Sequence, residues 1–388
     1  MKLGDLSCSL PFPHRQDEDW QFTDVSFLQN IDFHLAQLPA IAPLSDTSAK
    51  QQIQITNGGL CYFPNLSQGI SCTISEVPFS PSNEHSWDYF AQLNCQYNPT
   101  TIHCHIPDRL QVLLPLEVNY QVTQERSLVL PRLVLQVGAN SQVTLIERFQ
   151  PSALLDSYLH NAVTQIHLAP SAKLIHIRIQ TESPSAFHIA TTLVTQAQNS
   201  VYHAYMLDLG AKLSRHNPHI YSQGEGTVSE IWGLTITSGD RLSDTHSSIH
   251  HSYPNTYSRQ LHKAIIGDRS QVVFNGRIVV SKQAQNTDSA QLSRSLLLSS
   301  QAKINTKPQL EIMADNVKCK HGATVSQLDS EEIFYLQSRG IDHTSASQLL
   351  TMSFALEVIQ NLTSDALRGE LTQQIKNALP SFDTTGQR

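Results

Sequence analysis

The sequence predicts a mainly β protein built around a parallel β-helix, and a two-residue period is the first observation behind this prediction. From about residue 110 onward, short segments alternate apolar and polar residues. Leu116, Val118 and Tyr120 alternate with polar neighbours, and Val272 and Phe274 lie in a similar run. This alternation is typical of strands that bury one face. No helical periodicity interrupts these segments before about residue 313, so we expect a continuous strand-rich core.

The second observation is a repeat, because clusters of small or turn-forming residues precede successive strand-like runs. Six clusters are anchored on Ser141, Ala172, Ser200, Thr227, Ser270 and Ala302. The steps between these anchors are 31, 28, 27, 43 and 32 residues. A repeat of this length that contains strands alone is typical of a β-solenoid. Propeller blades are longer and carry landmarks absent here, and a two-layer sandwich is a further alternative. We place the parallel β-helix at residues 96–312.

The N-terminal region, residues 1–95, is expected to be irregular with short helices, since long amphipathic periods are missing. Its most distinctive segment is Glu18–Asp24, in which Trp20 and Phe22 follow an acidic cluster. We interpret the two aromatic residues as anchors that dock this segment on the core.

The C-terminal region, residues 313–388, is expected to be helical. Asp329 or Ser330, Thr344 and Ser364 are candidate N-caps for three helices. The second helix carries a broad apolar face and the third ends before Pro380. Because the ends of a solenoid need covering, these helices either cap the core or present apolar surface to a partner.

Composition excludes several classes of function. The net charge of −7 leaves no electrostatic footprint for nucleic acid. No apolar run reaches the length of a membrane span, and neither a secretory nor a transit signal is visible, so we expect a cytoplasmic protein without membrane segments. The six cysteines include no CxxC pair and predict no disulfide framework, which suits a reducing compartment.

Cys319 and His321 form the strongest candidate site. On an extended segment, residues two apart project from the same face, and both side chains bind iron or zinc when deprotonated. The neighbouring Lys318 and Lys320 are expected to lower the pKa of the thiol. A closed zinc site needs four ligands, so the pair alone indicates a buried cysteine beside a histidine, or half of a site shared with a partner.

Other ligand-rich segments carry less weight. His103 and His105 flank Cys104 on a strand-like run, which separates the histidines from the cysteine. Histidines 246, 250, 251 and 262 are interpreted as structural polar side chains. The chain has no P-loop and no Rossmann glycine motif, so an ATPase in the same process would be another subunit.

Taken together, these residues resemble the SufB/SufD family of the SUF iron–sulfur cluster assembly machinery. The resemblance covers nearly the whole chain and is carried by Glu18–Thr23, Leu213–Asn217, Ala284–Gln285, Ser295–Ser299, Thr306–Ile312, Ala314–Thr324, Phe334–Ile341, Phe354 and Glu357–Val358. The family usually has Asp where Asn316 stands, and Trp-Arg-Tyr-Thr where this chain has Trp-Gln-Phe-Thr. Neither departure removes a proposed ligand.

Two features favour the SufD branch over the SufB branch. SufB-type chains carry Glu where Gly322 stands, and they carry a cysteine in the segment corresponding to Asp288–Arg294, which has none here.

The resemblance implies a right-handed parallel β-helix between helical N- and C-terminal regions. It also implies a non-catalytic scaffold that pairs with SufB and binds the SufC ATPase through C-terminal helices. His321 would contribute to a transient iron–sulfur cluster site shared with SufB, with Cys319 in support. The candidate SufC-docking residues are Leu349, Leu350, Phe354 and Glu357. Whether a flavin also binds is not readable from the sequence.

Two alternative functions remain open at this point. A β-helix enzyme acting on carbohydrates would carry clustered carboxylates on one face, whereas acidic residues are sparse in these strands. A homodimeric scaffold could form through exposed solenoid edges.

Overall fold

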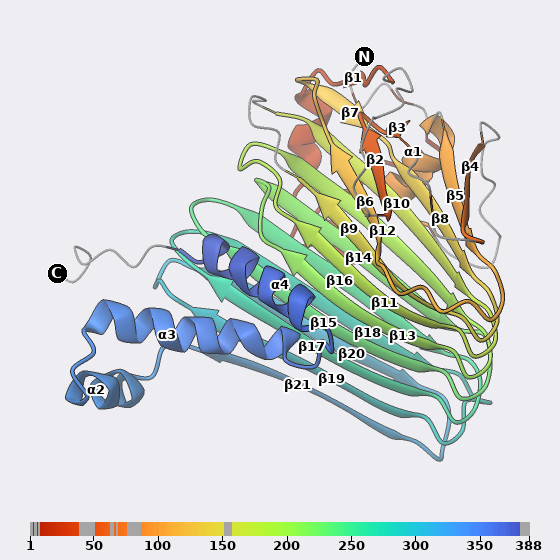
Figure 1. Cartoon of the computed structure of the whole chain (residues 1–388). Helices are drawn as coiled ribbons and strands as arrows, with labels where there is room; N and C mark the ends of the chain where they lie inside the picture. The colour runs from red at the N-terminus through yellow and green to blue at the C-terminus, as the bar shows by residue number, and fades with distance from the viewer. Residues whose placement is uncertain are drawn as a thin grey trace.

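The chain folds into a parallel β-helix in which each coil contributes one strand to each of two sheets (Figure 1). The computed structural model describes residues 8–38, 51–62, 69–75, 87–98, 100–150 and 157–380, together with Leu3, Leu6 and Leu66. From β8 to β19 each strand pairs in parallel with the strand two positions further along the chain, and the paired residues are 26 to 32 apart in sequence. The predicted mainly β solenoid is therefore confirmed.

Within the described residues, sheet A contains 11 strands and sheet B contains 10. Sheet A is made of β1 (His34–Leu35), β4 (Ser71–Ser75), β5 (Thr101–Ile106), β7 (Ser127–Val129), β8 (Arg132–Val137), β10 (Leu159–Leu168), β12 (Phe187–Gln196), β14 (Leu213–Ser222), β16 (Leu242–His251), β18 (Gln271–Val280) and β20 (Lys303–Ile312). Sheet B is made of β2 (Gln51–Thr56), β3 (Gly59–Tyr62), β6 (Leu116–Gln121), β9 (Gln142–Phe149), β11 (Lys173–Gln180), β13 (Val201–Asp208), β15 (Val228–Thr237), β17 (Tyr257–Ile266), β19 (Asp288–Leu297) and β21 (Lys318–Ser326).

The predicted repeat corresponds to the coils, with one irregular step explained by the topology. The anchors up to Thr227 precede strands of sheet B, whereas Ser270 and Ala302 precede strands of sheet A. The 43-residue step therefore crosses from one sheet to the other. Within sheet B, Val228 pairs with Tyr257, which is 29 residues further along the chain.

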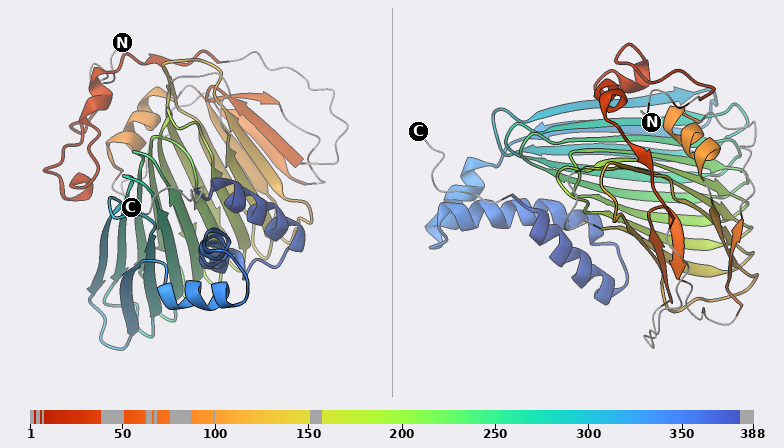
Figure 2. Two further views of the ribbon diagram at one scale, coloured as in Figure 1. Left: turned by 90° about the vertical axis from the view of Figure 1, so that its left-hand side faces the viewer. Right: turned by 90° about the horizontal axis from the view of Figure 1, so that it is seen from above.

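The N-terminal region covers the outer face of sheet A (Figure 2). Its described residues include the 3-10 helices η2 (Glu18–Trp20) and η3 (Ser26–Asn30) and the helix α1 (Tyr89–Tyr97). Trp20 is buried, and the Arg215 guanidinium of β14 lies 3.8 Å from the centre of its ring. Arg215 also pairs with Asp244 of β16, which accepts a 2.6 Å hydrogen bond from the Thr23 hydroxyl. The predicted docking of this segment through Trp20 is confirmed.

The C-terminal helices cover the outer face of sheet B, on the opposite side of the molecule (Figure 2). They are α2 (Ser330–Ser338), α3 (His343–Leu356), the 3-10 helix η4 (Glu357–Ile359) and α4 (Asp365–Ala378). Buried residues of α3, η4 and α4 pack against apolar side chains of the sheet B strands from β9 to β19. Among the described residues, no helix is both long and apolar enough to cross a membrane.

Three sequence predictions need correction. The solenoid does not end at residue 312, because β21 adds a strand up to Ser326. This strand pairs on one side alone and is largely exposed, so it lacks the apolar alternation that reveals inner strands. Strands β1 to β4 also lie within residues 1–95, where irregular structure with short helices was expected. The N-cap of α3 is Asp342 rather than Thr344, since its carboxylate accepts a bond from the Ser345 backbone N–H. The Asp329 and Ser364 caps are confirmed.

A disulfide joins Cys72 of β4 to Cys104 of β5. The two residues are direct partners in the antiparallel β4–β5 pair, and Cys104 is buried. The cysteine spacing did not predict this bond, because strand pairing rather than sequence proximity brings the two thiols together.

Candidate functional site

The solenoid has an open end formed by its last two strands (Figure 1). Within the described residues, β20 pairs with β18 alone and β21 pairs with β19 alone, so each has one edge without a neighbouring strand. Apolar side chains are exposed around this end, among them Ile312, Met313 and Val325. Unpaired strand edges with apolar side chains readily accept a further strand from another chain.

Cys319 and His321 lie on β21 and face the interior of the solenoid at this open end. Their ladder partners on β19 are Ser289 and Gln291, both of which are buried. Cys319 is half-buried and packs against an apolar cluster that includes Val280. His321 is exposed. The predicted placement of the two side chains on one face of a strand agrees with this geometry.

The pKa of the Cys319 thiol is shifted in the opposite direction to the one that the sequence suggested. Burial raises its pKa above the ordinary value, and the nearby Asp288 carboxylate acts in the same direction. The predicted lowering by Lys318 and Lys320 is wrong, because strand alternation places both lysines on the opposite, exposed face. Of the two candidate ligands, His321 is therefore the more accessible to a partner or a metal ion, because its side chain is exposed whereas the Cys319 thiol is half-buried.

The pair does not make a complete metal site by itself. In the described part of the chain, one group of three or more His, Cys, Asp or Glu side chains is close enough to hold an ion, and it lies elsewhere. Two ligands leave coordination positions open for a second chain or a substrate.

Two of the candidate docking residues are engaged within the chain. The Lys263 ammonium of β17 lies 4.0 Å from the centre of the Phe354 ring and donates a 2.9 Å hydrogen bond to the Phe354 backbone carbonyl. Glu357 pairs with Lys263 and, at 3.0 Å, with Arg294 of β19. These contacts hold the end of α3 on sheet B.

The other two docking candidates lie further toward the start of α3. Leu349 is 53% exposed and Leu350 is half-buried. Phe334 and Tyr335 of α2 are 72% and 58% exposed. Exposed apolar surface on the C-terminal helices is thus concentrated on α2 and the first half of α3, which project beyond the sheet (Figure 1).

Sequence reasoning missed a buried group of three side chains, His160, Glu182 and His188. His160 and His188 are ladder partners on β10 and β12, so they lie one coil apart. Their 28-residue separation matches the predicted repeat, and that coincidence is the signal that could have identified them.

Comparison with known proteins identifies the family. Residues 120–354 match the family model described as the SufBD core domain of the SUF system for FeS cluster assembly. The chain belongs to the SufBD family. It is 37% identical to an iron–sulfur cluster assembly SufBD family protein of Synechocystis sp., over 95% of this chain and 88% of the relative. It is 30% identical to the iron–sulfur cluster assembly protein SufD of Escherichia coli, over 95% of this chain and 89% of the relative.

A chloroplastic relative in Arabidopsis thaliana, the protein ABCI7, is 31% identical over 96% of this chain and 83% of its own length. The predicted resemblance to the SufD branch is thus confirmed by relatives that cover almost the entire chain. Because the family match spans β6 to α3, it includes the strand that carries Cys319 and His321.

Proposed function

We propose that the chain is a SufD-type scaffold subunit, without an enzymatic activity of its own, that pairs with a SufB-type chain and helps to build nascent iron–sulfur clusters. The observation that carries this proposal is the open end of the solenoid with His321 exposed on it. A second solenoid placed against this end would cover its apolar rim and bring further ligands toward His321. The cluster would be the transient cargo of the pair.

The ligand role of His321 is tested by replacing it with Ala in the complex of this chain with its SufB and SufC partners. Cluster formation, followed by absorbance after anaerobic reconstitution, should fall at least about 10-fold, since a lost metal ligand weakens a site by this order or more. Cys319→Ala should have a smaller effect, because its thiol is half-buried with a raised pKa.

His34→Ala is the matched control, because His34 is an exposed histidine on β1, in the N-terminal region and away from both the open end and the C-terminal helices. It should leave cluster yield unchanged. An undiminished yield in His321→Ala, with the complex still assembled, would remove the proposed role of His321.

We also propose that SufC docks on α2 and the first half of α3. This rests on the exposed Phe334, Tyr335 and Leu349. Phe354 and Glu357 then act indirectly, by holding α3 against sheet B.

A further inference from the structure

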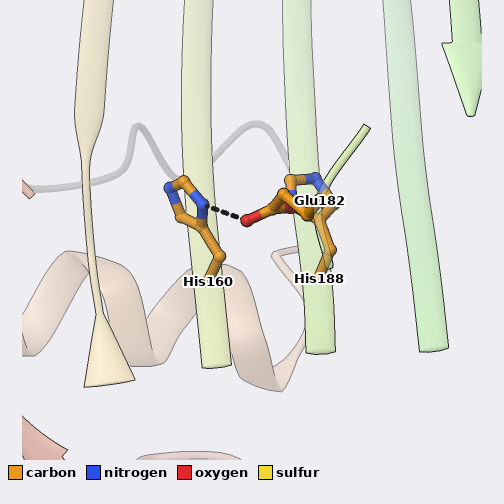
Figure 3. A group of neighbouring side chains, drawn as sticks. All are labelled: His160, Glu182 and His188. Carbon is orange, nitrogen blue, oxygen red and sulfur yellow. Dashed lines mark hydrogen bonds and ion pairs between the residues drawn. The ribbon is translucent and has the colours of Figure 1, made fainter. Parts of the chain in front are cut away.

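A second potential metal site lies in the interior of the solenoid, among His160, Glu182 and His188 (Figure 3). The histidines project from β10 and β12, and Glu182 lies in the connection between β11 and β12. Nδ1 of His160 is 2.9 Å from one oxygen of Glu182, and Nδ1 of His188 is 2.5 Å from the other. All three side chains are buried, with at most 2% exposed. The two imidazoles therefore converge on one carboxylate.

The neighbouring buried carboxylate, Glu147, shows what an ordinary structural arrangement looks like in this interior. It receives hydrogen bonds from the hydroxyls of Tyr120 and Thr164, at 2.6 and 2.8 Å, and contacts Nε2 of His176 at 2.8 Å. Glu182 differs, because two imidazoles lie against its oxygens; Gln180 adds a 3.3 Å bond, and the Tyr158 hydroxyl lies nearby. Nδ1 of His188, although close to Glu182, lies outside hydrogen-bond geometry.

Ring nitrogens of the group lack hydrogen-bond partners. Arg178 lies beside the group, where it pairs with Asp208 at 2.8 Å and contacts Nε2 of His188. Among the described residues, neither Nε2 of His160 nor Nδ1 of His188 makes a hydrogen bond, although both are buried. The chain itself therefore supplies no partner for Nδ1 of His188, and a bound ion would provide one.

We propose that His160, Glu182 and His188 bind one divalent transition-metal ion, and that ferrous iron is the ion the site takes. Two imidazoles and one carboxylate are the donor set of non-haem ferrous sites, which leave further coordination positions open. The ligand atoms lie within 4.8 Å of one another, so small side-chain movements bring them around an ion at about 2.1 Å.

The surroundings hold both rings in place. The Phe149 ring packs edge-on against His160 and His188, with ring centres 5.2 and 4.8 Å apart. Arg178 donates a hydrogen bond to Nε2 of His188, because a guanidinium can only donate. This contact leaves Nδ1 of His188 directed at Glu182, which is the side on which an ion would bind.

The test is an anaerobic titration of the purified full chain with ferrous iron, in a His321→Ala background that disables the open-end site. One equivalent of iron should remain bound in this background. Glu182→Gln should weaken iron binding about 100-fold or more. This exceeds the loss expected when a residue that merely hydrogen-bonds to a metal ligand is replaced. Glu147→Gln is the matched control, since it removes the neighbouring buried carboxylate and should leave iron bound.

A second measurement needs no interior substitution. Crystals of the unaltered chain soaked with ferrous iron should show an anomalous scattering peak between His160, Glu182 and His188. No iron in the His321→Ala background, equal binding by Glu182→Gln, or an anomalous map without this peak would each overturn the inference. The outcome is independent of the proposed cluster role, because metal content of the single chain is measured rather than cluster yield of a complex.

Discussion

At the scale of single residues, Lys263 links the C-terminal helices to sheet B through its contacts with Phe354 and Glu357. Its side chain is fully buried, and burial lowers the pKa of its ammonium, which the pairing with Glu357 opposes. Glu357→Ala leaves this buried charge with the Phe354 carbonyl as its remaining strong partner. We expect a loss of about 1–3 kcal/mol in the free energy of unfolding, reduced from the fully buried case because Glu357 is partly exposed.

This loss should be measured by urea denaturation, together with amide hydrogen exchange across α3 and α4. Glu370→Ala serves as the comparison, because Glu370 of α4 forms a more exposed pair with Arg148 and should cost under about 1 kcal/mol. Equal effects of the two substitutions would show that Lys263 has no special role in holding these helices.

The sequence predicts the arrangement of the residues at the open end better than that of the candidate docking residues. The shared face of Cys319 and His321 follows from strand alternation, which requires nothing beyond local sequence. The engagement of Phe354 and Glu357 depends on Lys263, which lies 91 and 94 residues away. An apolar or acidic side chain on a helix does not reveal whether its partner belongs to the same chain.

At the scale of elements, α2 and α3 divide into an anchored part and an exposed part. If SufC docks on the exposed part, Phe334→Ala combined with Leu349→Ala should reduce SufC capture at least about 10-fold, since apolar anchors dominate interface energies. Deleting residues 344–388 is a less specific experiment, because it also exposes the apolar outer face of sheet B and so changes more than the proposed docking surface.

Lys376→Ala, an exposed polar change on α4 outside the proposed docking surface, is the matched control and should leave capture intact. The thermal midpoint should stay within a few degrees in all variants, because the replaced side chains are exposed. Capture that survives the double substitution would place SufC docking elsewhere.

Element types were easier to predict from the sequence than element limits. Inner strands such as β18 can be recognised in the sequence because burial of a strand face leaves apolar residues along it. Strand β21 is largely exposed, so its sequence resembles that of a loop. The disulfide between Cys72 and Cys104 is a property of strand pairing and leaves no local trace.

At the scale of the whole molecule, the solenoid interior is rich in buried neutral histidines. Burial lowers the pKa of both His251 and His262 to about 4. His262 faces Asp208, which raises its pKa slightly against burial, and His250 lies near His251 and lowers its pKa further. In the unfolded chain both imidazoles titrate near pH 6.5. Between about pH 6.5 and 4, the unfolded chain therefore binds protons that the folded chain does not.

Stability should consequently fall as the pH drops through this window, because the folded-state pKa values lie below the unfolded ones. At pH 5, each of the two histidines costs about 2 kcal/mol relative to pH 7. The double variant His251→Gln and His262→Gln should be less stable at pH 7, because it loses hydrogen bonds to Ser258 and Thr256 and the stacking on Phe274. Its free energy of unfolding, measured by urea denaturation, should nevertheless decline less steeply toward pH 5. His343→Gln, which changes an exposed histidine, should retain the wild-type slope, and a double variant with an equally steep slope would contradict this assignment.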